Sequence, residues 1–598
     1  MIRPIPIGID DFRKLREEGF EYVDKTHFIT EFIDSNNIKV ILVPRPRRFG
    51  KSMNMTTLKW FLEKRDENLW HLFEGLHVAR AGDKYREHFQ KYPVVHISLK
   101  EAKAEDFETC FRETKRLIGD MYAQHESALE GKLDPRDEAD FRAIWRGTAD
   151  DALYRRSLKN LTRYLHQVHG VRPIVLIDEY DAGIQAGYLH GFYEKAISFF
   201  GAFFLAGLKD NMHLERAVMT GILRVSRESI FSELNNVGVY SLLDFEFNTC
   251  FGFTEPEVQG LLEKAGMADL MDAVRSFYDG YEFGMVDIYN PWSILSFLAR
   301  KDRNVVPYWV NVGSNLLIKE TMHHHAFAVQ EEVETLLGGG VIEKHIHENV
   351  VLPDLKEDPR VLWNLLVFSG YLKAARPGPP IPGHPRPPFR LSIPNKEVAE
   401  VYRTTFQSWM DRALVGQGGA LQELLDALLK GNAPRFEKQL QKFAGSLPSY
   451  HDVEGLEPEK FYHGMMIGLL ASLEPDYEVR SNRESGEGRP DVLIKPRYAG
   501  KAGAVLELKS ARKGVTTIEK AMAEGLRQLE ENDYAADLRA AGVEKITQMV
   551  VAFNGKRVMV LPKGAKAPKR GAIKKVGESI KKAAKKVVAK AKKATKKT

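Results

Sequence analysis

Short apolar runs alternate with helix-like segments through the first 250 residues. Residues 53–64 and 151–169 carry apolar side chains at helical spacing. Four runs have the length and β-branched content of buried strands, and the last leads into Thr220: residues 38–43, 94–99, 174–177 and 217–219. Buried strands separated by helices predict a parallel sheet that is covered on both faces.

From about residue 251 the pattern becomes mostly helical, as far as about residue 370. Thr254 is the expected N-cap of the first of these helices, since acidic residues fill the turn after it. Residues 377–388 then hold seven prolines, which would suit a linker between domains. Because residues 371–373 and 389–393 on either side have strand character, we favour a long hairpin loop, as in the wing of a winged-helix domain.

A second α/β region follows a mostly helical stretch at 398–440, which we expect to break near Gly431. Its predicted elements are helices at 459–473 and 517–531 and strands at 492–495, 504–508 and 548–553. The pattern thus predicts a multidomain α/β protein. Its predicted domains and segments are residues 1–250, 251–405, 406–450, 451–562 and 563–598.

Composition bears on where the protein works. The longest uncharged apolar run, 196–208, has 13 residues, whereas a membrane span needs about 20, so it predicts a buried helix and no membrane segment. Asp10 and Asp11 stand where a signal peptide would be apolar. Cys110 and Cys250 cannot build a disulfide framework, and neither has a sequence partner that suggests a thiol nucleophile or a zinc site. We therefore expect a cytoplasmic protein.

Charge is placed unevenly along the chain, whose net charge is +6. Residues 563–598 hold 14 Lys and one Arg against one acid, a net +14, which leaves −8 for the rest. A Lys- and Ala-rich segment without aromatic residues cannot build a core, so we expect a disordered tail. Its charge suits nonspecific binding to nucleic-acid phosphates, DNA first; a solubilising tail and a membrane-surface contact are the alternatives.

A phosphate-binding motif follows the first predicted strand. The segment R-P-R-R-F-G-K-S fits the P-loop template G-x-x-x-x-G-K-[S/T], except that Arg45 replaces the first glycine. In such a loop, backbone N–H groups at Gly50 cradle phosphate oxygens. Lys51 would neutralise the β- and γ-phosphates of ATP and Ser52 would ligate Mg²⁺. Arg45 and Arg48 add positive potential to the loop.

Acids at the end of the third predicted strand complete this motif. Asp178 and Glu179 fall at the carboxyl edge of the sheet, where α/β proteins bind ligands. We expect Asp178 to hold the Mg²⁺ shell and Glu179 to orient and activate the attacking water. Thr220 ends the neighbouring strand, where it would sense the γ-phosphate. Arg224 or Arg227 would serve as an arginine finger or sensor, although a surface ion pair explains either equally well.

The first 315 residues resemble the AAA-ATPase-like family, and the likeness weakens toward residue 400. It rests on motifs in this order: P-I-G and D-F near the N-terminus, Y-V-D-K-T, R-P-R-R-F-G-K-S, S-I-F-S with L-N-N, D-G-Y, Y-N-P-W and Y-W-V-N. In that family an arginine at the first P-loop glycine is usual. The resemblance implies a P-loop ATPase core that uses ATP and Mg²⁺, then a helical and winged-helix region. A homo-oligomer is also expected, because such ATPases often complete their site with a neighbour's arginine.

A second charged cluster lies in the C-terminal α/β region. Asp491 begins one predicted strand, and Glu507 and Lys509 lie two residues apart on the next, so both point to one face. Two carboxylates and a lysine suit Mg²⁺-dependent phosphodiester hydrolysis. The acids would hold the metal, and the lysine would orient water or balance negative charge. Taken alone, alternating charges more often mark a half-exposed edge strand.

The wider context resembles the PD-(D/E)XK nuclease domain that commonly follows the AAA-ATPase-like domain. The likeness covers about residues 450–555 and adds these features: Glu459 before F-Y-H, the segment S-N-R-E-S-G, Gln528 and Tyr534. It implies catalytic roles for Asp491, Glu507, Lys509 and Gln528. It also implies metal ligation by Glu459, with Glu457 as the alternative.

These observations predict ATP-controlled cleavage or remodelling of nucleic acid. Two alternatives stay open at this point. One is a non-catalytic, ATP-controlled switch that uses the nuclease fold only to dock on nucleic acid. The other is an ATPase regulator or scaffold that acts on proteins.

Overall fold

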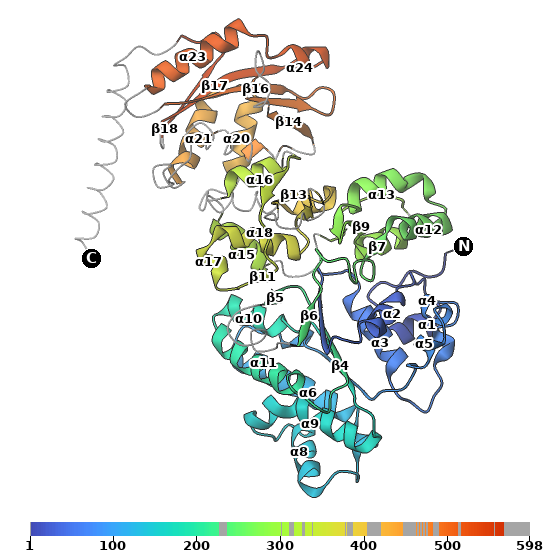
Figure 1. Ribbon diagram of the computed structural model, residues 1–598. Helices are drawn as coiled ribbons and strands as arrows, with labels where there is room; N and C mark the ends of the chain where they lie inside the picture. Colours follow the sequence, from blue (N-terminus) through green and yellow to red (C-terminus); the bar gives the residue numbers. More distant parts are fainter. Residues whose placement is uncertain are drawn as a thin grey trace, which may run out of the picture. The chain divides into compact units, whose positions relative to one another are not determined.

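The structure is a computed structural model of the 598-residue chain. It forms two compact units, residues 1–326 with 339–401 and residues 327–338 with 402–598 (Figure 1). The residues that it describes are 2–225, 236–300, 302–309, 316–325, 329–337, 339–376, 378, 387–402, 420–446, 462, 466, 469–470, 473, 476–481, 490–511, 516–554 and 557–566.

A five-stranded parallel sheet forms the centre of the first unit, as the sequence predicts. Its order is β2-β3-β4-β1-β6, and each pairing within it is parallel. Four of its strands coincide with predicted runs: β1 (Val40–Pro44), β2 (Val94–Ser98), β3 (Ile174–Asp178) and β4 (Arg216–Gly221). The fifth is β6 (Val237–Val239). Strand β4 separates β1 from β3, so the ends of these three strands meet at one edge.

Helices lie on opposite sides of this sheet, with α3 (Lys51–Leu62) on one side and α11 (Tyr193–Leu208) on the other (Figure 1). Four buried phenylalanines of α11 confirm that the longest apolar run is a core helix. Helix α9 (Asp151–His169) has the predicted bounds, with Asp150 as N-cap. The other helices here are α1 (Phe12–Glu17), α2 (His27–Asp34), α4 (His77–Arg80), α5 (Asp83–Arg86), α6 (Phe107–Ala123), α7 (Glu126–Leu129), α8 (Pro135–Trp145) and α10 (Ala182–His190).

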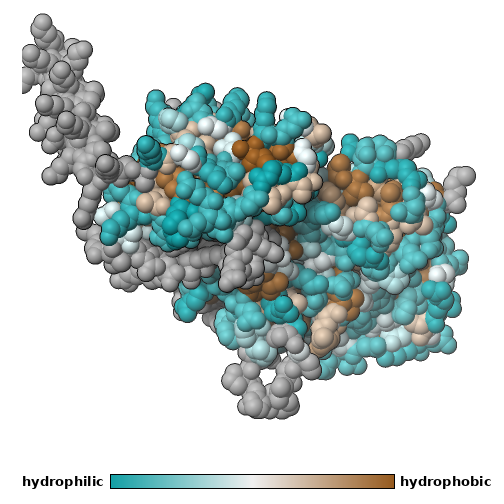
Figure 2. Space-filling model, turned by 90° about the horizontal axis from the view of Figure 1, so that it is seen from above, coloured by the Kyte–Doolittle hydropathy of each residue, from teal (hydrophilic) through white to brown (hydrophobic). Residues whose placement is uncertain are grey.

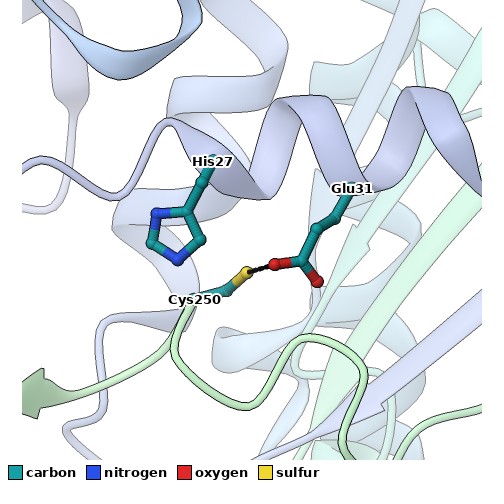
Figure 3. A group of neighbouring side chains, drawn as sticks. All are labelled: His27, Glu31 and Cys250. Carbon is teal, nitrogen blue, oxygen red and sulfur yellow. Dashed lines mark hydrogen bonds between the residues drawn. The ribbon is translucent and has the colours of Figure 1, made fainter. Parts of the chain in front are cut away.

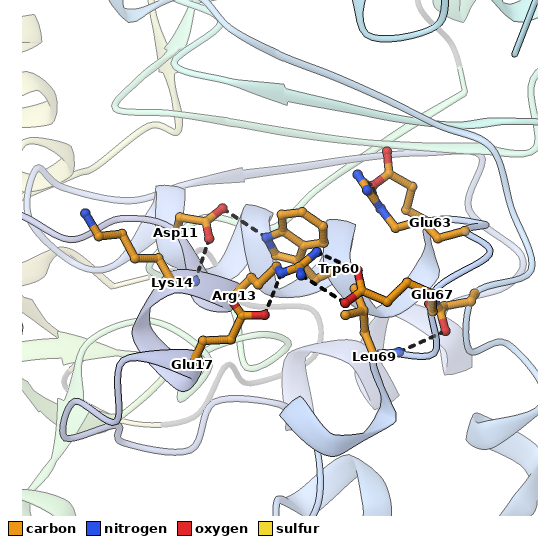
Figure 4. Close-up of polar contacts among 10 residues, drawn as sticks. Asp11, Arg13, Lys14, Glu17, Trp60, Glu63, Glu67 and Leu69 are labelled. Carbon is orange, nitrogen blue, oxygen red and sulfur yellow. Dashed lines mark hydrogen bonds and ion pairs between the residues drawn. The ribbon is translucent and has the colours of Figure 1, made fainter. Parts of the chain in front are cut away.

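Polar contacts fix the N-terminal helix α1 against α3 (Figure 4). Asp11 caps α1 by accepting from the Lys14 N–H at 2.9 Å, and its other oxygen accepts from the Trp60 indole N–H, also at 2.9 Å. Arg13 bridges Glu17 and Glu67. The chain before α1 is thereby held beside the helix that follows the P-loop motif.

The remainder of the first unit is mostly helical, with small sheets. Thr254 and Glu257 form the predicted capping box of α12 (Glu255–Ala265). The hairpin around the proline-rich segment is also confirmed, because β12 (Lys373–Ala375) pairs antiparallel with β13 (Phe389–Ser392). The other elements are β5 (Arg224–Val225), β7 (Phe253–Thr254), α13 (Met271–Tyr278), β8 (Tyr281–Phe283), β9 (Val286–Tyr289), α14 (Pro291–Ala299), α15 (Leu316–His325), β10 (Ile342–Lys344), β11 (Asn349–Val350), α17 (Asp354–Glu357) and α18 (Pro359–Phe368).

The second unit is built on a mixed five-stranded sheet, in the order β14-β15-β16-β17-β18. Its strands are β14 (Tyr477–Ser481), β15 (Val492–Pro496), β16 (Gly503–Ser510), β17 (Ile546–Asn554) and β18 (Arg557–Pro562). Its helices are α16 (Gln330–Leu337), α20 (Ala420–Leu429), α21 (Ala433–Ser446), α23 (Ile518–Glu531) and α24 (Ala536–Ala540). The break between α20 and α21 is where the sequence predicts it.

Two apolar cores cover the two faces of this sheet. Leu506 and Leu508 pack with α20 and α21, whereas Val505 packs with α23. Alternate side chains of β16 therefore enter different cores. Most of the predicted helix 459–473 and of the basic tail lies outside the described residues.

Apolar residues are largely withdrawn into these cores. Figure 2 shows a mostly hydrophilic surface on the face in view, with hydrophobic residues in small separate groups. Within the part of the chain that the structure describes, no helix has the length and apolar content to cross a membrane.

Candidate active sites

The P-loop motif connects β1 to α3 at the carboxyl edge of the parallel sheet. Gly50 precedes α3 with a φ of 82°, and Arg48 has a φ of 71°, which is rare for a residue with a side chain. The buried Lys51 ammonium donates to the carbonyl oxygens of Arg45 and Pro46 at 3.1 and 3.0 Å. The loop therefore curls around the lysine, with the N-terminus of α3 at its base, as a phosphate cradle requires.

Asp178 connects the first turn of α3 to the end of β4 at this edge. Its carboxylate accepts from the Ser52 hydroxyl at 2.6 Å and from the Thr220 hydroxyl at 2.6 Å. Asp178 is 3% exposed. The structure thus brings Ser52, Asp178 and Thr220 together, although they lie up to 168 positions apart. A hydroxyl and a carboxylate oxygen in contact are hard donors of the kind that Mg²⁺ prefers.

Glu179 follows Asp178 with a φ of 50° and turns toward two lysines. Its carboxylate lies 3.1 Å from the Lys103 ammonium. Burial raises the pKa of Glu179, but Lys103 and Lys51 outweigh burial, so its pKa lies below the usual value. Burial lowers the pKa of Lys51, and Glu179 and Asp178 oppose that shift. Glu179 is therefore held ionised, as a group that accepts a proton from water must be.

A cavity of about 440 Å³ opens beside these residues. Gly50, Lys51 and Ser52 line it together with Glu179. Residues near the N-terminus and in α14 add apolar side chains to the lining: Pro6, Ile9, Val23, Pro291, Trp292 and Leu295. A cavity with a few charged groups and several apolar side chains has the composition of a small-molecule binding site.

Two of the predicted phosphate-binding arginines behave differently from each other. Arg48 is exposed and lines the cavity, with its guanidinium 4.3 Å from the centre of the Trp292 ring. Arg45 is 0% exposed and donates to carbonyl oxygens of Pro44, Tyr240 and Phe247. The predicted contact of the Arg45 side chain with the nucleotide is therefore wrong. Arg45 is a core residue, and its hydrogen bonds to these carbonyls stabilise the loop from the protein interior.

Arg224 is likewise placed away from the cavity. Its guanidinium lies 3.7 Å from the Glu348 carboxylate, beside the pairing of β5 with β11. The ion-pair interpretation of Arg224 fits this position, and the sensor role is not supported within the chain. Arg227 lies outside the described residues.

The second cluster forms on the antiparallel pair β15 and β16. Glu507 and Lys509 share the face of β16 that packs under α23, and the Lys509 ammonium lies 2.7 Å from the Glu507 carboxylate. Asp491 immediately precedes β15, and its carboxylate accepts from the Leu508 N–H at 2.7 Å. Glu507 is 3% exposed. The predicted triad is therefore assembled at one end of the sheet, partly buried rather than on an open edge.

Helix α23 closes this cluster on one side. A side chain at Gly525 would come within 3.2 Å of Cγ of Lys509, so the helix crosses directly over the lysine. Gln528 lies three residues further along, on the same helical face. Burial is the main cause of the raised pKa of Tyr534. The charges of Glu507, Lys509 and Asp491 also act on this pKa. Glu459 and Glu457 lie outside the described residues, so their predicted metal role is untested.

Comparison with known proteins matches both regions. Residues 6–231 fit a family model described as predicted AAA-ATPase, and residues 457–562 fit one for the PD-(D/E)XK nuclease superfamily. The chain has an AAA-ATPase-like domain and a PD-(D/E)XK nuclease superfamily domain. An uncharacterised protein encoded in the vnfD 5′ region of Azotobacter chroococcum mcd 1 is 27% identical over 564 residues, which cover 92% of this chain and 96% of that protein.

Sequence reasoning missed two residues of the AAA-ATPase-like domain that line the cavity. Lys103 lies just beyond the end of β2, so a search of every strand end for charged residues would have found it. Trp292 stands within the Y-N-P-W motif, but no local pattern indicates that its ring contacts Arg48.

The sequence indicates no partner for either cysteine that would suggest a thiol nucleophile or a zinc site, but the structure places two polar side chains beside Cys250. Its thiol donates to the Glu31 carboxylate at 3.4 Å, and His27 lies next to both. Glu31 and Cys250 are 219 positions apart in the chain, so spacing alone could not relate them.

Proposed function

We propose that the chain is an ATP-binding and ATP-hydrolysing protein that controls a Mg²⁺-dependent nuclease domain acting on DNA or RNA. The observation that carries the ATP half is the contact of Ser52 and Thr220 with Asp178, beside the loop around Lys51. The nuclease half is carried by the ion pair between the buried Glu507 and the half-buried Lys509, with Asp491 at the neighbouring strand.

In the AAA-ATPase-like domain, each residue then has a distinct task. Lys51 and the N–H groups at the start of α3 bind the β- and γ-phosphates. Ser52 and Asp178 would hold Mg²⁺, which would neutralise phosphate charge. Glu179 accepts a proton from the attacking water, and Thr220 keeps Asp178 oriented. The apolar side chains that line the cavity receive the base.

Nucleotide binding and turnover by the full chain separate these roles. Lys51→Ala should abolish binding of a fluorescent ATP analogue, whereas Lys64→Ala, at an exposed position just beyond α3, should not. Glu179→Gln should keep binding but lose about 10²- to 10⁴-fold in hydrolysis rate, the usual contribution of a general base. Unchanged hydrolysis in Lys51→Ala would remove the phosphate-site assignment.

In the nuclease domain, Asp491 and Glu507 would hold Mg²⁺. The bound ion would supply Lewis acidity for activating water and stabilising the leaving oxygen. Lys509 orients that water or balances the charge of the phosphodiester. Gln528, on α23, positions the lysine. The basic tail, residues 563–598, supplies nonspecific affinity for nucleic acid.

Cleavage of labelled DNA and RNA in the presence of Mg²⁺ tests this half. Glu507→Gln and Asp491→Asn should each reduce cleavage by more than about 100-fold, because each removes a metal ligand. Glu524→Gln, at an exposed position of α23, is the matched control. Binding of nucleic acid without any cleavage by the wild-type chain would instead favour a non-catalytic switch.

A further inference from the structure

Three side chains of different chemistry meet beneath the loop that precedes β7. His27 and Glu31 come from α2, and Cys250 comes from the loop. Each offers one ligand atom, and these atoms all lie within 4.8 Å of one another. In Figure 3, the imidazole and the carboxylate project from the same side of α2 toward the sulfur. The cluster lies in the first unit and is separate from the Ser52–Asp178 contact.

The arrangement has the composition of a zinc site, and its sulfur–oxygen distance fits one. Residues four apart on a helix share one face, which is how a helix supplies two ligands to one ion. Imidazole nitrogen, carboxylate oxygen and thiolate sulfur are all ligands of Zn²⁺. In a tetrahedral site, Zn–S of about 2.3 Å and Zn–O of about 2.0 Å place those two ligand atoms about 3.5 Å apart. The Cys250 sulfur and the Glu31 oxygen are 3.4 Å apart.

The surrounding charges tolerate a bound dication. Without a metal, the Cys250 thiol carries its proton and donates to Glu31. A metal would displace that proton, as it does in zinc–thiolate sites generally. The dication, the thiolate and the Glu31 carboxylate would then sum to zero charge. The neighbouring cations Lys25 and Arg45 would thus face a neutral group rather than an excess of positive charge.

We propose that His27, Glu31 and Cys250 bind one Zn²⁺, with water as the fourth ligand. The ion would tie α2 to the loop behind the P-loop. That loop already contacts the nucleotide side of the domain, since the Cys250 carbonyl accepts from Asn54 of α3 at 2.7 Å and the Gly252 N–H donates to the Phe49 carbonyl at 3.1 Å. Zinc would therefore stabilise the position of the Cys250 loop against the P-loop and α3. The inference does not depend on ATP hydrolysis or on nuclease activity.

Cobalt substitution tests the site directly in the full chain. Metal is removed with a chelator, Co²⁺ alone is titrated in, and the near-ultraviolet charge-transfer band from thiolate to Co²⁺ is followed. The proposed Mg²⁺ sites have only oxygen ligands, so they give no such band. The band should saturate at one Co²⁺ per chain and disappear when Zn²⁺ is added.

Variants assign the band to its ligands. Cys250→Ser should abolish it, and Cys110→Ser, which changes the other buried free cysteine, should leave it intact. His27→Gln and Glu31→Gln should each weaken Co²⁺ affinity by about 10- to 100-fold or more. Zn²⁺ should raise the melting temperature of the wild-type chain but not that of His27→Gln.

Three results would overturn the proposal. The first is the absence of the band with Co²⁺ in excess over protein. The second is a band that survives in a folded Cys250→Ser variant. The third applies even if that variant fails to fold: Co²⁺ affinity that is unchanged in both His27→Gln and Glu31→Gln would show that the cluster is only hydrogen-bonded.

Discussion

Replacing Arg45 by methionine should destabilise the AAA-ATPase-like domain rather than only weaken nucleotide binding. The guanidinium is fully buried between the rings of Phe251 and Phe283, 5.4 and 5.3 Å from their centres. It donates to the carbonyl oxygens of Pro44, Tyr240 and Phe247. Methionine has a similar unbranched shape but donates no hydrogen bond, so the three carbonyls would lose this donor.

The expected loss follows from two opposing terms. A buried acceptor left unsatisfied costs about 1–3 kcal/mol, so three cost roughly 6 kcal/mol. Burial lowers the pKa of Arg45 to about 10, a desolvation penalty of about 3 kcal/mol that the substitution removes. The difference is a loss of about 3 kcal/mol in the free energy of unfolding, or roughly 5–10 °C in melting temperature.

Thermal unfolding of the full chain, with nucleotide affinity measured in parallel, checks this prediction. Arg48→Met is the matched control, because Arg48 lies in the same loop but is exposed on Trp292; its loss removes a cation–π contact of about 1 kcal/mol or less. If Arg45→Met has the same melting temperature as Arg48→Met but binds ATP much more weakly, the Arg45 side chain acts on phosphate. That result would refute its assignment to the core.

Three further outcomes follow from the cavity and the tail. ATP should change the fluorescence of Trp292, because Arg48 stacks on it, and Trp292→Phe should lose that change. Lys103→Met should raise the pKa of Glu179, so the acid limb of the pH profile for ATP hydrolysis should move to higher pH; an unmoved limb would exclude Glu179 as the base. Deleting residues 563–598 should weaken nucleic-acid binding at low salt and flatten its salt dependence, as measured by a fluorescence-anisotropy titration.

The local sequence pattern was enough to predict the segments in which a buried strand and its functional side chains lie within a few residues of each other. An apolar run that ends in Asp178 defines β3 and its acidic end, and alternation along β16 places Glu507 with Lys509. The hairpin of β8 and β9 was missed, because its strands are only three and four residues long and each carries an exposed or half-exposed acid.

Side-chain direction was harder to predict than backbone path. The P-loop template correctly gave the turn around Lys51, but the core that receives Arg45 is made by Phe251 and Phe283, about 200 positions away. Cys250 reaches His27 and Glu31 across a similar separation. Such contacts depend on how the loop after β6 returns to α2, which no local motif encodes.

The most direct test of the central claim is the rate at which the full chain cleaves labelled DNA and RNA in Mg²⁺, with and without ATP, compared with Lys51→Ala and Glu507→Gln. If the ATP site governs the nuclease domain, ATP should change the wild-type rate, Lys51→Ala should cleave at one rate whether or not ATP is present, and Glu507→Gln should not cleave. A wild-type rate that ATP leaves unchanged, or cleavage that persists in Glu507→Gln, would contradict the account.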